Sequence, residues 1–250
     1  MAQNGIVTSL AGLVRGMKRR REAMGPVVVL AVLAFGAYAF LAIADEVAEG
    51  EIRALDRQLF VALRDPANPS EPLGPPWLEE VALEITALGG YTLIVLALAV
   101  IVGLLVVTRR YGPALYAVLS VGSGALISHF LKQYYERPRP DLADHLDVVH
   151  TLSFPSGHAL VATVAYLTMA ALVVRFFDDL RVRLYVLFVA VAVSVAVGIT
   201  RVYLGVHWPS DVAAGWALGA AWASLTWLVV SLLQYRRRGN SAKRGGDHGA

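Results

Sequence analysis

The sequence predicts an all-α polytopic membrane protein with about six transmembrane helices. Of its 250 residues, 57% are hydrophobic and only 16% are charged, whereas soluble domains average about 45–50% apolar and about 25% charged residues. The chain has no cysteine, which excludes disulfides, thiolate metal sites and thiol catalysis. Six apolar runs approach the roughly 20 residues that a helix needs to cross a bilayer: Pro26–Ala44, Tyr91–Thr108, Pro113–Leu131, Ala159–Val174, Leu184–Thr200 and Val212–Leu233.

Clusters of basic residues predict how these runs are oriented. If all six runs cross the membrane, the clusters fall on one side, which the positive-inside rule assigns to the cytoplasm. Residues 1–25 are then a basic cytoplasmic N-terminus, and the polar, Gly-rich residues 236–250 a disordered cytoplasmic tail. The clusters are Arg15 to Arg21, Arg109 with Arg110, Arg175 to Arg183, and Arg236 to Arg238.

The first run has an alternative interpretation as a secretory signal peptide, with Ala42-Ile43-Ala44 as the cleavage site. Its apolar length exceeds the usual 7 to 15 residues of such a signal, so we expect a retained span. The fourth run reaches span length only if its helix begins near Pro155. The six-span domain is expected to occupy residues 26–235.

Residues 45–90 are expected on the outer side as helices that lie in the membrane interface. Apolar residues recur at helical spacing from Ile52 to Leu63, with charged residues between them. A Pro-rich turn at residues 66–76 ends this helix. A second amphipathic pattern follows from Trp77 to Gly90.

Three polar clusters interrupt the apolar background, and the predicted topology places all of them on the outer side. Lys132, Arg139 and Arg201 supply fixed positive charge, and the planar arginine fork suits phosphate oxygens. Ser156-Gly157-His158 stands where a helix is expected to start, so free backbone N–H groups there can also bind an anion. A single cation at such a position is more often a headgroup anchor, but the combination indicates an anion site.

His207 and Asp211 are four residues apart, which brings their side chains together if the last helix begins near Trp208-Pro209. A carboxylate at that position can hold one imidazole nitrogen as N–H and leave the other free to attack. The pair therefore predicts an activated histidine nucleophile.

The three motifs together resemble the signatures of the type 2 phosphatidic acid phosphatase (PAP2) superfamily, in its membrane lipid phosphatase branch. They are Lys-x6-Arg-Pro from Lys132 to Pro140, Pro-Ser-Gly-His from Pro155 to His158, and Arg-x5-His-x3-Asp from Arg201 to Asp211. Thr200 stands where the family usually has serine, which keeps a hydroxyl. The resemblance implies a PAP2-like helical bundle.

The resemblance also implies a mechanism for hydrolysis. His207 attacks phosphorus to form a phosphohistidine, Asp211 orients it, and His158 protonates the leaving oxygen. Phosphate-binding residues stabilise the transition state without a metal or other cofactor. They are Lys132, Arg139, Ser156, Gly157 and Arg201.

The expected function is that of a metal-independent phosphatase (EC 3.1.3 or 3.6.1 type) in the inner membrane, acting on a lipid phosphate at the extracytoplasmic face. Undecaprenyl diphosphate is the first choice of substrate. Alternatives are phosphatidylglycerophosphate, phosphatidic acid and lipid A, or phosphotransfer to another lipid. A transporter or a haloperoxidase-like protein fits less well, because the spans carry no acid, Lys or Arg at their centres and haloperoxidases are soluble. No nucleic-acid partner is expected.

Three further features have weaker functional interpretations. His129 is expected to be a satisfied polar residue at a helix end or an indirect neighbour of the site. The segment from Asp141 to His150 is interpreted as a solvated loop over the site, because its spacing matches no metal template. Arg137 is expected either at the pocket mouth or in a surface pair with Glu136.

Overall fold

The computed structural model describes residues 2–142, 146–147 and 151–246, with side chains from residue 25 to residue 236 within those ranges. Within them the chain folds into helices and has no strand, apart from an isolated bridge between Arg64 and Pro72. The helices are α1 (Ala2–Glu49), α2 (Arg53–Val61), α3 (Pro76–Ala87), α4 (Tyr91–Val107), α5 (Tyr111–Tyr135), α6 (Gly157–Val174), α7 (Leu180–Tyr203) and α8 (Pro209–Gly246).

The helices confirm a polytopic membrane protein with about six spans. Five segments are long and apolar enough to cross a bilayer: Gly25–Glu49, Tyr111–Tyr135, Gly157–Val174, Leu180–Tyr203 and Pro209–Arg236. The pair α3 and α4 qualifies as a sixth span, bent by 43°. Gly89 lies at the bend, where an added Cβ would approach Val197 to 2.3 Å. The helix interruption thus coincides with close packing against α7.

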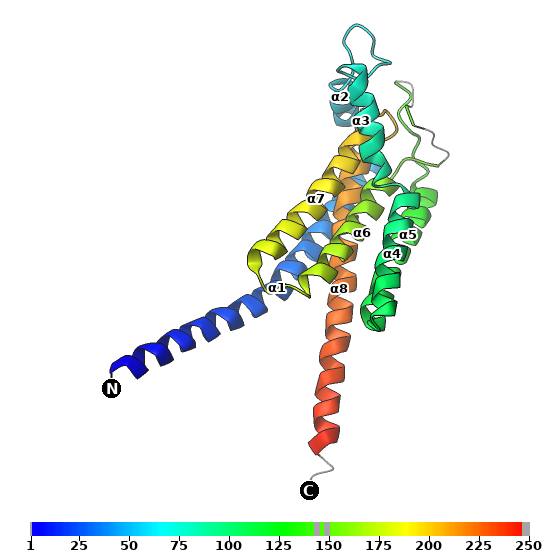
Figure 1. The fold of residues 1–250 in the computed structure, drawn as a ribbon. Helices are drawn as coiled ribbons and strands as arrows, with labels where there is room; N and C mark the ends of the chain where they lie inside the picture. Colours follow the sequence, from blue (N-terminus) through cyan, green and yellow to red (C-terminus); the bar gives the residue numbers. More distant parts are fainter. Residues whose placement is uncertain (1, 143–145, 148–150, 247–250) are drawn as a thin grey trace.

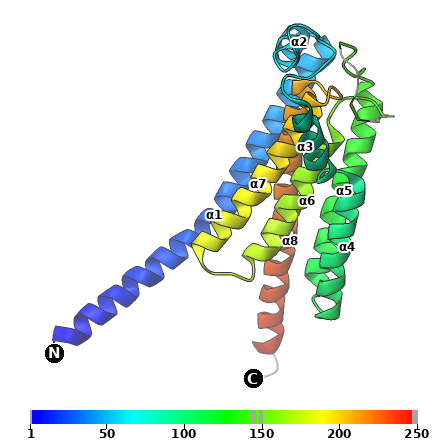
Figure 2. The same ribbon diagram turned by 45° about the horizontal axis from the view of Figure 1, so that its top comes forward.

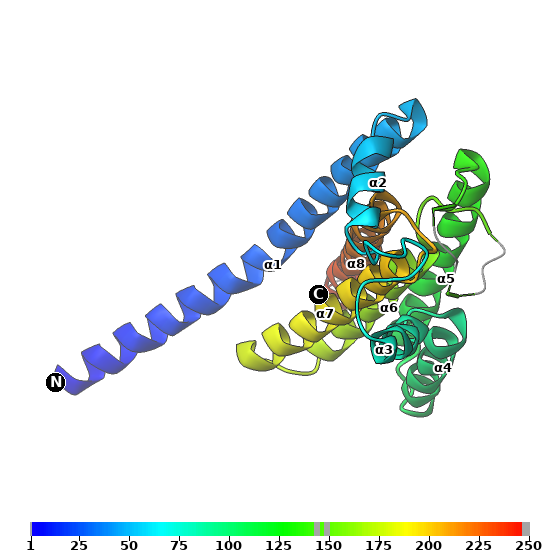
Figure 3. The ribbon, with the colours of Figure 1, turned by 90° about the horizontal axis from the view of Figure 1, so that it is seen from above.

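Helix α6 forms the centre of the bundle (Figure 3). In its most apolar stretch 61% of the residues are buried, against 17–39% in the other four single spans. Leu160 and Val164 belong to a core that includes Val121 of α5 and Val197 of α7. Small residues permit the close approach of α8, because an added Cβ at Gly219 would lie 2.8 Å from the Leu160 carbonyl oxygen.

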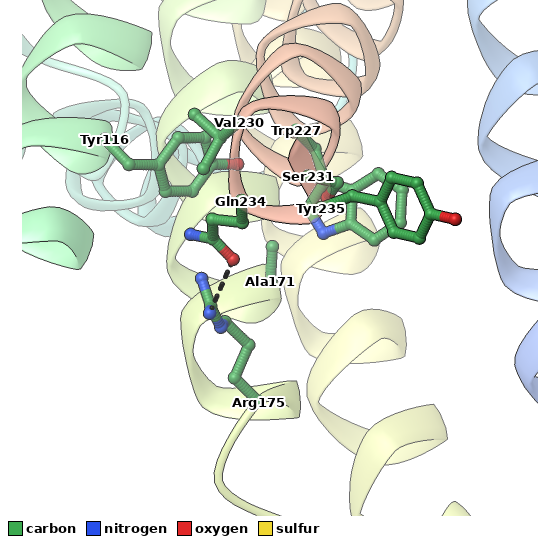
Figure 4. A pocket seen from close by; sticks show the side chains of 8 residues that line it. All are labelled: Tyr116, Ala171, Arg175, Trp227, Val230, Ser231, Gln234 and Tyr235. Atoms are coloured by element: carbon green, nitrogen blue, oxygen red, sulfur yellow. Dashed lines mark hydrogen bonds between the residues drawn. The ribbon is translucent and has the colours of Figure 1, made fainter. Parts of the chain in front are cut away.

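The two ends of the bundle differ in character. Both chain termini lie at one end, whereas α2, α3 and the α5–α6 and α7–α8 connections lie at the other (Figures 1 and 2). At the terminal end a cavity of about 350 Å³ opens between α5, α6 and α8, beside the Arg175–Gln234 hydrogen bond of 3.0 Å (Figure 4). Its lining residues among the described side chains include no histidine or carboxylate: Tyr116, Ala171, Arg175, Trp227, Val230, Ser231, Gln234 and Tyr235.

The helix boundaries differ from the sequence expectation at both termini. Helix α1 is continuous from Ala2 through Pro26, so the basic segment and the first span form one helix. Helix α8 continues to Gly246, into the segment expected to be a disordered tail. No proline follows Pro209, and the arginines at positions 236–238 are good helix formers, so nothing in the sequence ends the helix at residue 235. The helix then continues through Gly239 and Asn240, which are poorer helix formers.

We predict that Gly198→Leu destabilises the bundle by about 1–3 kcal/mol, because an overpacked contact forces side chains from their preferred positions. An added Cβ at Gly198 would lie 2.4 Å from the Trp216 ring, and the Trp216 indole N–H is held by the Ser194 carbonyl at 2.9 Å. Thermal unfolding in detergent measures the effect. Gly103→Leu is the matched control, because Gly103 has open space around it. An equal loss in both variants would contradict tight α7–α8 packing.

Candidate active site

The three polar clusters meet at the end of the bundle opposite the termini, where two helices end and two begin. Lys132 lies in the last turn of α5 and Arg201 in the last turn of α7. Gly157 begins α6, and Asp211 lies in the first turn of α8. The positive dipole ends of α6 and α8 therefore point into a region that also contains basic side chains, a combination suited to anions.

The Pro155–His158 segment is hydrogen-bonded to the cluster that contains His207 and lies close to Lys132. The Ser156 backbone N–H donates to the Asp211 carbonyl oxygen at 2.9 Å. An added Cβ at Gly157 would lie 3.5 Å from Lys132 Cε and 3.3 Å from Ser128 Oγ. A larger residue at position 157 would therefore fill space beside the lysine.

The imidazole of His207 is almost completely buried, with 1% exposure. Its two nitrogens have different surroundings. Nδ1 lies 3.4 Å from Asp211 Oδ2 and 3.3 Å from Ser153 Oγ, whereas Nε2 lies 3.2 Å from Arg139 Nη1. The acceptors beside Nδ1 favour the tautomer with its proton there, which leaves the Nε2 lone pair on the arginine side.

The carboxylate of Asp211 is fully buried and accepts several hydrogen bonds. Oδ2 accepts from the Trp208 backbone N–H at 2.9 Å and from the Ser153 hydroxyl. Oδ1 accepts from Arg137 Nη1 at 2.6 Å. Because its lone pairs are bound from several sides, the carboxylate is fixed in place beside the imidazole.

Arg139 and Lys132 are held mainly by backbone carbonyl groups. Arg139 Nε donates to the Thr151 carbonyl at 2.7 Å, and Arg139 Nη1 donates to the Val206 carbonyl. Lys132 Nζ donates to the carbonyls of Leu152 and Ser153. Neutral partners leave the positive charge of both side chains uncompensated, which suits them to an incoming anion.

The side chain of Arg201 is 1% exposed and makes both a hydrogen bond to a neutral partner and an ion pair. Its Nη1 donates to Thr86 Oγ1 at 3.0 Å and pairs with Asp147 Oδ2 at 2.5 Å, while its buried Nε has no hydrogen-bond partner among the described residues. A buried donor without a partner is costly and is readily used by a ligand.

Burial and the surrounding cations determine the protonation of the groups outside the spans. Burial, followed by Lys132, Arg139 and Arg201, lowers the pKa of His207 well below its ordinary value, so the imidazole is neutral at pH 7. Burial and the nearby Arg201 lower the pKa of Arg139 to about 10, so the guanidinium stays charged at pH 7.

Ser156 and His158 have different positions at the start of α6. The Ser156 hydroxyl caps the helix by accepting from the Ala159 N–H at 3.5 Å, so in this structure it satisfies the helix end. His158 is half-buried in the first turn, and its backbone packs against Gly89 at the α3–α4 bend.

The structure adds contacts that the motifs do not predict. Arg137 pairs with Asp56 of α2 and with Asp211, not with Glu136. Ser153 stands between His207 and Asp211. Asp56 and Ser153 give no periodic or motif signal in the sequence, so only the fold could identify them. Arg137 lies inside the first motif and was a candidate on that ground.

The remaining candidates from the sequence differ in their positions relative to the site. His129 is exposed and contacts the Phe130 ring. In the loop after Pro140, Asp147 pairs with Arg201, whereas Asp144, His145 and His150 lie outside the described residues. No group of three or more His, Cys, Asp or Glu side chains within the described part of the chain is arranged to hold a metal ion.

Comparisons with known proteins identify the family of the chain. A family model described as the PAP2 superfamily matches residues 113–235. Phosphatidylglycerophosphatase B of Bacillus subtilis is 39% identical over 148 residues, which cover 58% of this chain and 71% of that protein. Decaprenylphosphoryl-5-phosphoribose phosphatase of Mycobacterium tuberculosis is 38% identical over 109 residues, 41% of this chain and 55% of that protein.

A solved structure is similar over a larger part of the chain. The crystal structure of a transmembrane PAP2 type phosphatidylglycerolphosphate phosphatase from Bacillus subtilis has a TM-score of 0.67 and 28% identity. The match covers 84% of this chain and 96% of that one. Sequence motifs, helical architecture and relatives agree, and the chain belongs to the PAP2 superfamily of membrane lipid phosphatases.

Proposed function

We propose that this phosphatase hydrolyses a lipid phosphate at the extracytoplasmic face through a phosphohistidine on His207, and that its substrate carries a second anionic group. The observation that carries the mechanism is the asymmetry of the imidazole. Nδ1 lies beside Asp211 and Ser153, and Nε2 faces the cation Arg139 at 3.2 Å. A nucleophile with one nitrogen oriented by a carboxylate and the other directed at an anion site is equipped for in-line attack on phosphorus.

In the first step Nε2 of His207 forms a bond to phosphorus while the bond from phosphorus to the lipid oxygen breaks. His158 gives its proton to that oxygen. Lys132, Arg139 and Arg201, with the Ser156 hydroxyl and the Gly157 N–H, bind the three phosphoryl oxygens and stabilise their charge. In the second step water attacks phosphorus, His158 takes a proton from the water, and the P–N bond breaks to release phosphate.

The distribution of arginines supports a location of this site on the extracytoplasmic side of the membrane. Arg109, Arg110 and Arg175 line a cavity of about 520 Å³ at the end of the bundle that also carries both termini. The positive-inside rule favours the cytoplasm for that end. The active site, at the opposite end, then faces the outer leaflet.

A cavity close to His207 supports the proposed class of substrate. It has a volume of about 350 Å³ and lies between the end of α1, α2 and the loop after α5. Arg139 links it to His207, and Asp56 and Arg137 in its wall pair with each other. Arg53 and Arg57 of α2 remain as exposed cations and outnumber the one further carboxylate in the wall, Asp141, so a second anionic group beside the reacting phosphoryl group is favoured here.

The relatives support the same class. The names phosphatidylglycerophosphatase and decaprenylphosphoryl-5-phosphoribose phosphatase both describe lipids with two phosphate groups. Undecaprenyl diphosphate, the first choice from the sequence, also has two, whereas phosphatidic acid has one. We therefore propose undecaprenyl diphosphate or phosphatidylglycerophosphate as the substrate ahead of phosphatidic acid.

The nucleophile is tested by phosphate release from these three lipids in detergent with a chelator present. We expect the wild type to release phosphate and His207→Ala to lose at least about 1,000-fold in kcat, because the covalent route is removed. Wild-type enzyme quenched with SDS at alkaline pH should contain phosphate on His207 that is released by acid. Activity of His207→Ala near the wild-type level would refute the mechanism, and His129→Ala, at an exposed histidine, is the control.

The second anion site is tested by Arg53→Gln/Arg57→Gln. We expect kcat/KM to fall about 10-fold for the two substrates with two phosphate groups, since each exposed charge contact contributes about 1 kcal/mol or less. For phosphatidic acid the change should be less than about twofold. Glu79→Gln/Glu80→Gln on α3 controls for altered interfacial charge. An equal loss on all three lipids would contradict the second site.

The pH dependence follows from the lowered pKa of His207. The imidazole must be neutral to attack, and burial and three cations hold its pKa well below 6.5, so kcat/KM should stay high at pH 6 and decline only in more acidic solution. Arg139→Gln removes one of those cations, so its acidic limb should move to higher pH. Arg181→Gln, at the far end of the bundle, should leave the profile unchanged. A wild-type acidic limb at or above pH 6.5 would contradict this assignment.

A further inference from the structure

Helix α2 places a buried carboxylate at the edge of the active site. Asp56 is 2% exposed, although α2 lies outside the region of residues 113–235 that matches the family model. Burying a carboxylate is unfavourable unless it is paired and hydrogen-bonded. Phe60 is the other buried residue of α2 and already anchors the helix against Trp208, with ring centroids 5.6 Å apart. Phe60 thus already anchors α2, so the apolar packing of this helix does not explain why the carboxylate of Asp56 is buried.

The first partner of Asp56 is the start of α8. Asp56 Oδ1 accepts from the Ser210 backbone N–H at 2.9 Å, and Oδ2 accepts from the Ser210 hydroxyl at 2.6 Å. A carboxylate that accepts a free N–H at a helix N-terminus is favourably placed. Because Ser210 immediately precedes Asp211 and is three residues after His207, this contact fixes the backbone that carries both side chains.

The second partner is Arg137, whose fork connects two carboxylates. Its Nη2 lies 2.7 Å from Asp56 Oδ2 and its Nη1 lies 2.6 Å from Asp211 Oδ1. Nη1 also donates to Ser210 Oγ at 2.8 Å. The guanidinium is planar, so bonds at both of its ends determine its orientation and, with it, the position of Oδ1 of Asp211.

The summed charge of Asp56, Arg137 and Asp211 also favours the proposed reaction. One guanidinium between two carboxylates leaves a net formal charge of −1 next to His207. The imidazole becomes positively charged when Nε2 bonds to phosphorus, and nearby negative charge stabilises that state. Without Asp56, the positive charge of Arg137 would act on Asp211 alone and cancel its carboxylate charge.

We infer that Asp56 is a positioning residue of the active site, which acts through Arg137 and Ser210 to hold Asp211 in place and to keep the cluster negative beside His207. The inference rests on the proposed roles of His207 and Asp211. It means that α2, an interfacial helix outside the matched family region, completes the catalytic centre.

The test compares Asp56→Asn, Arg137→Gln and the double variant with wild type, using phosphatidylglycerophosphate in detergent. We expect Asp56→Asn to lower kcat by about 10- to 100-fold, less than the ~10⁴-fold that loss of a carboxylate in direct contact with a catalytic histidine can cost. Neither KM nor the inhibition constant of inorganic phosphate should rise more than about twofold, because the phosphate-binding cations are unchanged. Glu51→Gln, an exposed carboxylate next to α2, should match wild type.

The double variant distinguishes positioning from a general structural role. Because Asp56 acts through Arg137 as well as Ser210, the double variant should lose clearly less kcat than the product of the two single losses, since coupled residues are not additive. Multiplicative losses, a wild-type kcat in Asp56→Asn, or a change confined to KM would each overturn the inference.

Arg137→Lys provides a second test if Asp56→Asn does not fold. A lysine keeps the charge but cannot span both carboxylates, so we expect kcat to fall at least about 10-fold with KM unchanged. A wild-type kcat would overturn the inference. An inactive His207→Ala beside a fully active Asp56→Asn would refute this inference alone, whereas an active His207→Ala would refute the proposed function.

Discussion

The arrangement of the site depends on the compensation of buried charge around Asp211. A carboxylate with no exposure to water is stable only if its lone pairs are bound and a counter-charge is close. Arg137, Ser153 and the Trp208 N–H meet this requirement, and each comes from a different part of the α5–α6 connection or the start of α8. The carboxylate thus fixes the relative position of segments that are distant in sequence.

The cations on the other side of His207 are held differently. Arg139 and Lys132 bond mainly to backbone carbonyls, which orient the side chains without neutralising them. Two electrostatic environments therefore meet at one imidazole: negative charge that is already paired at Nδ1, and uncompensated positive charge at Nε2. In the proposed mechanism an incoming phosphate binds at the positive side, so that His207 acts as nucleophile and also lies in the anion site.

The bundle provides the rigid support that this arrangement needs. Helix α6 is buried by its neighbours, and α8 approaches it closely at Gly215 and Gly219. Van der Waals packing of small residues is the main stabilising contact between helices in a bilayer, because lipid is as apolar as the side chains. The same packing holds the N-termini of α6 and α8 together, next to the groups that we propose bind phosphate.

The membrane class, the approximate number of spans and the three motifs were predictable from the sequence. Apolar length and basic clusters have local causes, namely bilayer thickness and the membrane interface. Residues such as Lys132, His158 and His207 were identified because their chemistry is unusual for an apolar background. The extent of α1 and α8 was less predictable, because polar residues that are good helix formers can continue a helix beyond the membrane.

The sequence alone determined which side chains carry the charge and the nucleophilic nitrogen of the proposed phosphate site, because charge and nucleophilicity belong to residue types. Only the tertiary structure decided that Nε2 of His207 faces Arg139, that Ser153 lies between His207 and Asp211, and that Asp56 reaches Arg137. Asp56 and Arg137 are 81 residues apart, and no periodicity of the sequence links α2 to the segment that follows α5. Their contact arises because α8 begins where α2 crosses its first turn, and buried charges there must find partners.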